Sequence, residues 1–121
     1  MKSVAVAAVA VALLLAGCGG NSVTAPPGSI KVSMTEYAFS PNSLSAPAGK
    51  VVFFLVNDGK SQSHDMIIRD STGKRVAGSD LISVGDSVVF TVNSIAAGTY
   101  TIYCDQPGHE GSGMKGTLTI T

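Results

Sequence analysis

The chain has little charge and no surplus of basic residues. Only 13% of its 121 residues are charged, and eight Lys and Arg balance eight Asp and Glu. A nucleic-acid-binding domain normally presents a basic face, so this composition argues against a nucleic-acid partner. Beyond the first residues, no long window repeats apolar residues with the 3.6-residue period of a helix, and no segment repeats another. The missing helical period argues against a helical domain.

The one long apolar run lies at the N-terminus and is short for a membrane span. Lys2 precedes twelve apolar residues, Val4 to Leu15, whereas a spanning helix needs about 18 or more. A positive head, an apolar core and small residues before a cut are typical of a signal peptide. Leu15-Ala16-Gly17-Cys18 resembles a bacterial lipobox, which implies cleavage before Cys18 and lipidation of its thiol. The alternative is an ordinary secretory signal with an incidental cysteine.

The segment after Cys18 predicts a tether rather than a folded element. Residues 19–29 are rich in Gly, Asn, Ser, Thr and Pro and carry no charge, a composition typical of a flexible linker. The expected organisation is therefore a signal peptide over 1–17, a lipid-anchored tether over 18–29 and one domain over 30–121. We expect a mature protein anchored by lipid in the periplasm or on the extracellular face of the cell membrane.

The two cysteines have different expected fates. Two cysteines in an exported protein could form one disulfide, but a lipidated Cys18 has no free thiol. Cys104 is then unpaired, and an unpaired thiol in an oxidising compartment is a liability unless a metal ion holds it as the thiolate. The signal segment therefore supports a metal-binding role for Cys104.

The body of the chain reads as short strands separated by turn residues. Segments rich in β-branched and aromatic residues, such as 88–92 and 99–103, alternate with turn signals such as Asp58-Gly59 and Thr72-Gly73. The clearest predicted strands are Ile30–Glu36, Val51–Asn57, Met66–Arg69, Ser87–Asn93, Tyr100–Cys104 and Thr117–Thr121. Regularly spaced short strands predict an all-β fold, a β-sandwich.

One short loop gathers three different donors of metal-ligand type. Cys104, His109 and Met114 follow the spacing C-x4-H-x4-M, and His64 is the only other histidine. Two imidazoles, a thiolate and a weak thioether are the ligand set of a blue-copper electron-transfer site. The predicted cofactor is one copper ion that cycles between Cu(I) and Cu(II). Zinc is the alternative metal, although a thioether is a poor fourth ligand for it.

Each of these residues also has a simpler interpretation. An isolated cysteine is most often a buried inert thiol, and an isolated histidine is a satisfied polar or surface residue. Met66 rivals Met114 as the axial donor, but we expect it to pack beneath the site. Asp105 and Glu110 flank the ligands, and charged loop residues are usually solvated surface; the alternative is an acidic rim that steers basic partners.

At these residues the chain resembles the cupredoxins, the family of plastocyanin, azurin and pseudoazurin. The resemblance runs from about Ile30 to Ile120. Its segments are Glu36–Asn42 with Pro47–Lys50, Asn57–Gly59 leading to Ser63–Asp65, Gly98–Cys104, and Gly113–Leu118. The residue after the first histidine is often Asn in the family, and here it is Asp65. The resemblance implies a Greek-key β-sandwich, and it implies that His109 is the ligand nearer solvent, beside the docking patch.

The preferred function is that of a membrane-tethered electron carrier and not of an enzyme. Redox protein partners are expected to dock near His109, and the chain is expected to be a monomer. The alternative is a carrier or buffer that delivers copper to an oxidase, although the chain lacks Met- and His-rich tracts. A copper enzyme such as a nitrite reductase needs a second metal site, for which two histidines are too few.

Overall fold

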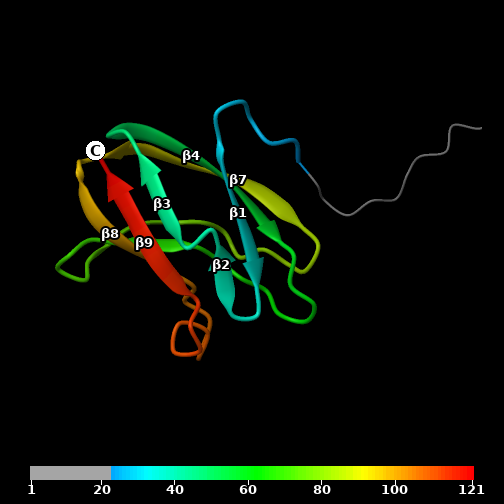
Figure 1. Cartoon of the computed structure of the whole chain (residues 1–121). Coiled ribbons are helices and arrows are strands. Elements are labelled where there is room, and N and C mark those ends of the chain that lie inside the picture. The colour runs from blue at the N-terminus through cyan, green and yellow to red at the C-terminus, as the bar shows by residue number, and fades with distance from the viewer. Residues whose placement is uncertain (1–22) are drawn as a thin grey trace, which may run out of the picture.

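A computed structural model describes residues 23–121, which form nine strands in two sheets (Figure 1). The first sheet has the strand order β2 (Ala38–Ser40), β1 (Ile30–Thr35), β4 (Gly49–Asn57) and β7 (Ser87–Ile95). The second has the order β3 (Ser43–Ala46), β9 (Lys115–Ile120), β8 (Gly98–Tyr103), β5 (Ile67–Arg69) and β6 (Arg75–Gly78). No helix in this described part is long and apolar enough to cross a membrane. The predicted all-β sandwich is confirmed.

Alternating side chains build the core between the sheets. In β4 the residues Val51, Phe53 and Leu55 are buried, while the residues between them are partly exposed. This period of two is what a strand with one buried face requires. The second sheet contributes Ile102 and Leu118, both fully buried.

Three strands are shorter or less regular in sequence and were not predicted. β2, β3 and β6 have three or four residues each and lack the runs of β-branched and aromatic residues that mark the predicted strands. The predicted strand over Met66–Arg69 begins one residue later, at Ile67, and that over Tyr100–Cys104 ends at Tyr103. Cys104 and Met66 therefore lie at strand ends rather than within strands.

The strand pairing brings distant loops to one pole of the sandwich. β1 runs parallel to β4, with Met34 opposite Asn57, so both strands end at the same pole. β8 runs antiparallel to β5 and β9, so its end lies beside the start of each, with Tyr103 opposite Ile67 and Lys115. In Figure 1 the loop before β9, drawn in orange, lies at the same end as the turn between β1 and β2. The turn between β1 and β2, the loop after β4 and the loop between β8 and β9 therefore meet at this pole.

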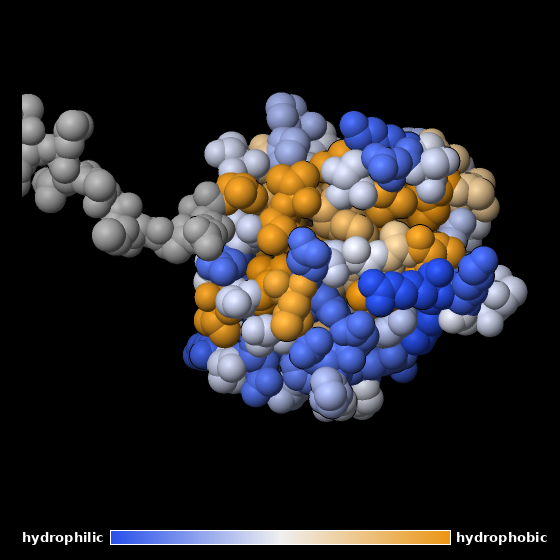
Figure 2. Space-filling view, turned by 180° about the vertical axis from the view of Figure 1, so that it is seen from behind, coloured by the Kyte–Doolittle hydropathy of each residue, from blue (hydrophilic) through white to orange (hydrophobic). Residues whose placement is uncertain are grey.

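The outer surface mixes apolar and polar side chains. The large apolar side chains that remain exposed are Val23, Tyr37, Val76, Leu81, Val84 and Val89. Figure 2, seen from behind, shows apolar surface crossed by polar groups. Exposed apolar side chains are usual in folded proteins. Among these residues Tyr37 lies in the turn between β1 and β2, at the pole where the loops meet.

Candidate metal centre

Three potential metal ligands from two loops converge in the interior of this pole. One donor atom from each of His64, Cys104 and His109 lies within 4.8 Å of the others. The Nδ1 atoms of the two imidazoles are 3.2 Å apart, and Cys104 Sγ lies 3.5 Å from His109 Nδ1. All three side chains are buried, His64 completely and His109 with 6% exposed. The fold thus brings together two imidazoles and one thiol that are up to 45 positions apart in sequence.

Hydrogen bonds of the main chain and of a buried amide fix the position of His64. Its N–H donates to Ile82 O at 3.0 Å, and its carbonyl accepts from the Ile82 N–H at 2.8 Å. Asn57, at the end of β4, donates from Nδ2 to both Gln62 O and Ile82 O at 2.9 Å, and its Oδ1 accepts from the Gly59 N–H at 2.9 Å. Asn57 therefore joins the loop before His64 to the segment around Ile82.

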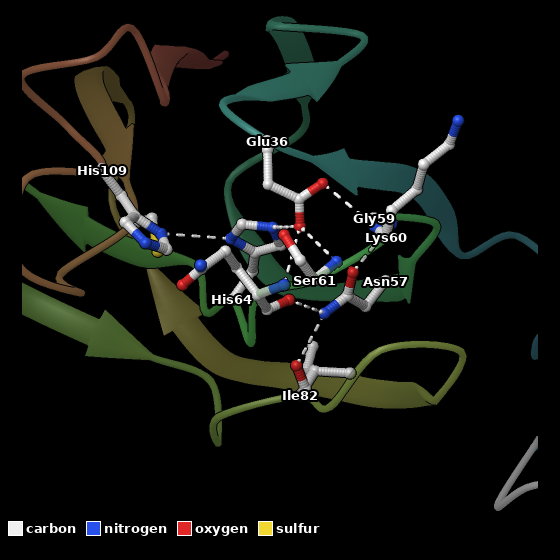
Figure 3. A network of polar contacts seen from close by, with 10 residues as sticks. Glu36, Asn57, Gly59, Lys60, Ser61, His64, Ile82 and His109 are labelled. Carbon is white, nitrogen blue, oxygen red and sulfur yellow. Dashed lines mark hydrogen bonds and ion pairs between the residues drawn. The ribbon is translucent and has the colours of Figure 1, made fainter.

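A carboxylate lies on the far side of the His64 ring (Figure 3). Glu36 Oε1 is 3.3 Å from His64 Nε2, and the same carboxylate accepts hydrogen bonds from the N–H groups of Lys60, Ser61 and Gln62. The bond from Lys60, with those from the other two N–H groups, lowers the pKa of Glu36 to about 2. Glu36 is therefore a carboxylate anion at neutral pH.

Turns within residues 104–114 bring Cys104 and His109 to one point. The His109 N–H donates to Gln106 O at 3.0 Å, and Gly108 adopts a φ of 79°, a value that glycine tolerates and other residues rarely do. The Cys104 N–H donates to Met114 O at 3.2 Å, and the Met114 N–H donates to His109 O at 3.0 Å. The loop therefore folds back on itself, with its first, middle and last residues bonded through the main chain.

Burial shifts the pKa values of two of the three donors, Cys104 and His64. Burial raises the pKa of the Cys104 thiol to about 11. Burial also lowers the pKa of His64, against the opposing hydrogen bond and charge of Glu36. Neutral imidazoles are the form that ligates metals, and a bound cation favours the thiolate over the thiol. Without a metal, the site thus favours the neutral, ligating form of His64 and keeps the sulfur of Cys104 protonated.

Contacts around the ligands join the loops to the sandwich. Asp65 Oδ1 accepts from the Asp105 N–H at 2.9 Å, linking the two ligand-bearing segments. Burial raises the pKa of Asp65 to about 6, and the side chain of Asp105 adds to this rise, whereas the hydrogen bond from the Asp105 N–H opposes it. Asp65, the residue that stands where the family often has Asn, thus joins the two loops through a carboxyl group in place of an amide.

The two acidic residues of the ligand loop have arginine partners. Glu110 forms a two-pronged ion pair with Arg69 of β5, whose guanidinium lies 4.4 Å from the centre of the Tyr103 ring. Asp105 lies 3.8 Å from Arg75 of β6. Neither carboxylate is simply a solvated loop charge, and the arginines offset the negative charge at this rim.

The sequence-predicted site residues fall into three groups. His64, Cys104 and His109 are brought together as predicted. Met114 is fully buried, and its main chain is bonded to the ligand loop. Met66, close to His64 in the sequence, is also fully buried. An axial role for Met114 stays a prediction. Cys18 lies outside the described residues, as do the signal peptide and the first part of the tether.

Sequence reasoning missed the partners of the two histidines. Besides Glu36 and Asn57, Tyr37 packs edge-on against His109, with ring centroids 4.8 Å apart. Glu36 and Tyr37 lie in the segment Glu36–Asn42, whose only signal in the sequence is its resemblance to the cupredoxins. Their distance from His64 and His109 along the chain left no local signal for these contacts.

The donor set fits copper better than other common metals. Two imidazoles and a thiolate, with a buried thioether on the same loop, match a trigonal copper site with a weak axial ligand. The site includes no carboxylate among the three converging donors, whereas magnesium and calcium require oxygen ligands. The fold and the site together define a small β-sandwich protein with a buried copper-type metal centre.

Comparison with known proteins identifies the family. The family model described as "Cupredoxin-like domain" matches residues 5–120. Auracyanin-B of Chloroflexus aurantiacus is 29% identical over 133 residues, covering 85% of this chain and 57% of the relative. A plastocyanin of Prochlorothrix hollandica is 30% identical over 117 residues, covering 93% of this chain and 84% of the relative. The chain belongs to the cupredoxin family, and it spans little more than half of the length of auracyanin-B.

Solved structures agree with this assignment. A structure of auracyanin B superposes with a TM-score of 0.68 at 28% identity, covering 85% of this chain and 96% of that one. Auracyanin A of Chloroflexus aurantiacus, whose title describes a "blue" copper protein, gives a TM-score of 0.69 at 23% identity, covering 84% and 100%. The latter likeness concerns the fold alone.

Proposed function

We propose that this protein is a blue copper protein that transfers single electrons between redox partners outside the cytoplasm. The observation that carries the proposal is the buried convergence of one donor atom each from His64, Cys104 and His109 within 4.8 Å of one another. Copper bound there would supply the one-electron couple between Cu(I) and Cu(II). The relatives named auracyanin, plastocyanin and azurin support a carrier rather than an enzyme.

In this function the chain holds its ligands in one geometry. Cys104, His64 and His109 provide the strong donors, and Met114 is the proposed weak axial donor. The hydrogen bonds of Asn57 and the ligand loop limit movement of both histidines. Because packed, bonded ligands cannot rearrange far between oxidation states, the protein keeps the structural cost of each electron transfer small.

The route to a partner passes near His109. His109 is only 6% exposed, and the 38% exposed Tyr37 packs against its ring. The proposed docking surface is therefore the outer face of Tyr37 together with the loop around Gly108. A redox protein bound there would lie closer to the copper than one bound at the opposite end of the sandwich.

A lipid at Cys18 is the proposed attachment to the membrane. The domain of residues 30–121 would be joined to it by the uncharged tether of residues 18–29. Anchoring would confine the carrier to the surface where membrane-bound redox partners are found. The proposed location is the periplasm or the extracellular face of the cell membrane.

The test of the copper assignment is spectroscopic. The purified domain with one equivalent of Cu(II) should show an intense visible thiolate-to-copper absorption band and the EPR spectrum of a thiolate-bound Cu(II). Cys104→Ser should abolish the band, and a circular dichroism spectrum should show that the variant keeps its strands. Retention of the full band by Cys104→Ser would refute the assignment. A wild-type protein that passes its copper to a weak acceptor within seconds would instead favour copper delivery.

A further inference from the structure

The two nitrogens of the His64 ring face different surroundings. Nδ1 faces His109 Nδ1 at 3.2 Å, in the cluster of candidate ligands. Nε2 faces outward to Glu36 Oε1 at 3.3 Å (Figure 3). Glu36 follows the last residue of β1 and comes from a segment 28 positions away in the chain. The imidazole is thus held between the metal site and a carboxylate.

The loop before His64 holds the carboxylate in place. The N–H groups of Lys60, Ser61 and Gln62 donate to it at 3.0, 3.3 and 2.9 Å. A Cβ on Gly59 would come within 2.5 Å of Glu36 Oε1, so glycine at this position leaves room for the carboxylate. The Glu36 side chain is 19% exposed. Glu36 is therefore a fixed anion beside the ring, and not a mobile surface charge.

A carboxylate only accepts hydrogen bonds, so it determines which ring nitrogen carries the proton. Contact with Glu36 requires the hydrogen of neutral His64 to reside on Nε2. The lone pair is then on Nδ1, the nitrogen that faces His109. The negative charge of Glu36 beside Nε2 also makes the ring a stronger electron donor at Nδ1. A stronger donor stabilises Cu(II) more than Cu(I), which lowers the reduction potential.

We propose that Glu36 is a positioning residue that fixes the His64 tautomer and lowers the reduction potential of the copper site. The inference rests on the proposed function. It assigns to this chain an anionic partner on its first histidine, supplied by the turn between β1 and β2. Glu36 acts through His64 and does not itself bind the metal.

The first test uses Glu36→Gln, which retains the shape of the side chain and removes its charge. Removing the outer partner of a metal-bound histidine typically weakens metal binding about 10–100-fold. We expect the affinity for Cu(II) to fall about 10-fold relative to that for Cu(I), which corresponds to a rise of about 59 mV in a one-electron potential. Voltammetry at one fixed pH and ionic strength measures it.

Asp58→Asn is the matched control. Asp58 is an exposed carboxylate near the end of β4 that accepts a hydrogen bond from Ser33 Oγ and has no contact with His64. Removing it changes the net charge equally, so it should move the potential much less. If both variants shifted the potential alike, general electrostatics would explain the effect and the proposal would be wrong. A lowered melting temperature with an unchanged potential would reduce Glu36 to a structural role.

A second test needs no metal and no variant. Nitrogen-15 NMR of the metal-free wild-type protein reports which ring nitrogen of His64 carries hydrogen. We expect the Nε2–H form, and a mixture of forms in Glu36→Gln. The Nδ1–H form in the wild type would overturn the proposal even if Glu36→Gln failed to fold. A wild-type protein with the Nε2–H form but no blue band would instead refute the proposed function alone.

Discussion

Replacing Asn57 with alanine should destabilise the domain strongly, although the residue is not a candidate ligand. Its side chain is fully buried and makes three hydrogen bonds, to Gln62 O, Ile82 O and the Gly59 N–H, each 2.9 Å long. Asn57→Ala removes all three at once. The loop that carries His64 would then lose its attachment to the end of β4.

The structure limits the expected loss. Each hydrogen bond contributes about 0.5–1.5 kcal/mol net, and a buried group left unpaired costs about 1–3 kcal/mol. Ile82 O still accepts from the His64 N–H, so only Gln62 O and the Gly59 N–H need new partners. We therefore expect a decrease of about 2–4 kcal/mol in the free energy of unfolding. In a domain of this size, that lowers the melting temperature by roughly 10 °C or more.

Urea and thermal unfolding of the metal-free protein, followed by circular dichroism, measure the effect. Asn93→Ala is the matched control, because Asn93 is exposed on β7 and a surface change usually stays within about 0.5 kcal/mol. Asn57→Asp adds a test of orientation: it keeps the acceptor for Gly59 but points a second acceptor at two carbonyls. It should be at least as unstable as Asn57→Ala at neutral pH. Equal stability of Asn57→Ala and Asn93→Ala would refute the reasoning.

Two further predictions concern residues outside the converging trio. Met114→Leu should keep copper bound and raise the reduction potential, because the site loses a soft, polar donor and Cu(II) suffers more than Cu(I) from an apolar site; Met66→Leu is the control in voltammetry, and a larger shift for Met66→Leu would make Met66 the axial ligand. Cys18→Ser should release the protein from membranes without changing its copper spectrum, because each buried lipid methylene contributes about 0.8 kcal/mol to anchoring; detergent phase separation measures this, and continued partitioning after confirmed signal cleavage would contradict the lipoprotein assignment.

The metal-binding chemistry was predictable because most of it is local. The spacing from Cys104 to Met114 places three candidate donors on one loop, and turn residues such as Gly108 allow the loop to fold back. The long strands were equally predictable, since alternating apolar residues in β4 and β7 repeat often enough to be recognised. The short strands β2, β3 and β6 have few β-branched or aromatic residues, and each is a strand because a neighbouring strand pairs with it.

The sequence alone therefore determined the class of fold and the three converging donors, His64, Cys104 and His109. Only the tertiary structure decided what surrounds them. Glu36 reaches His64 because β1 and β4 run parallel and end at one pole, with Met34 beside Asn57. Tyr37 covers His109 because the turn after β1 in one sheet and the loop before β9 in the other lie at the same end of the sandwich (Figure 1). Such contacts join segments with no shared periodicity, so they depend on strand order and register, which the arrangement of both sheets fixes as a whole.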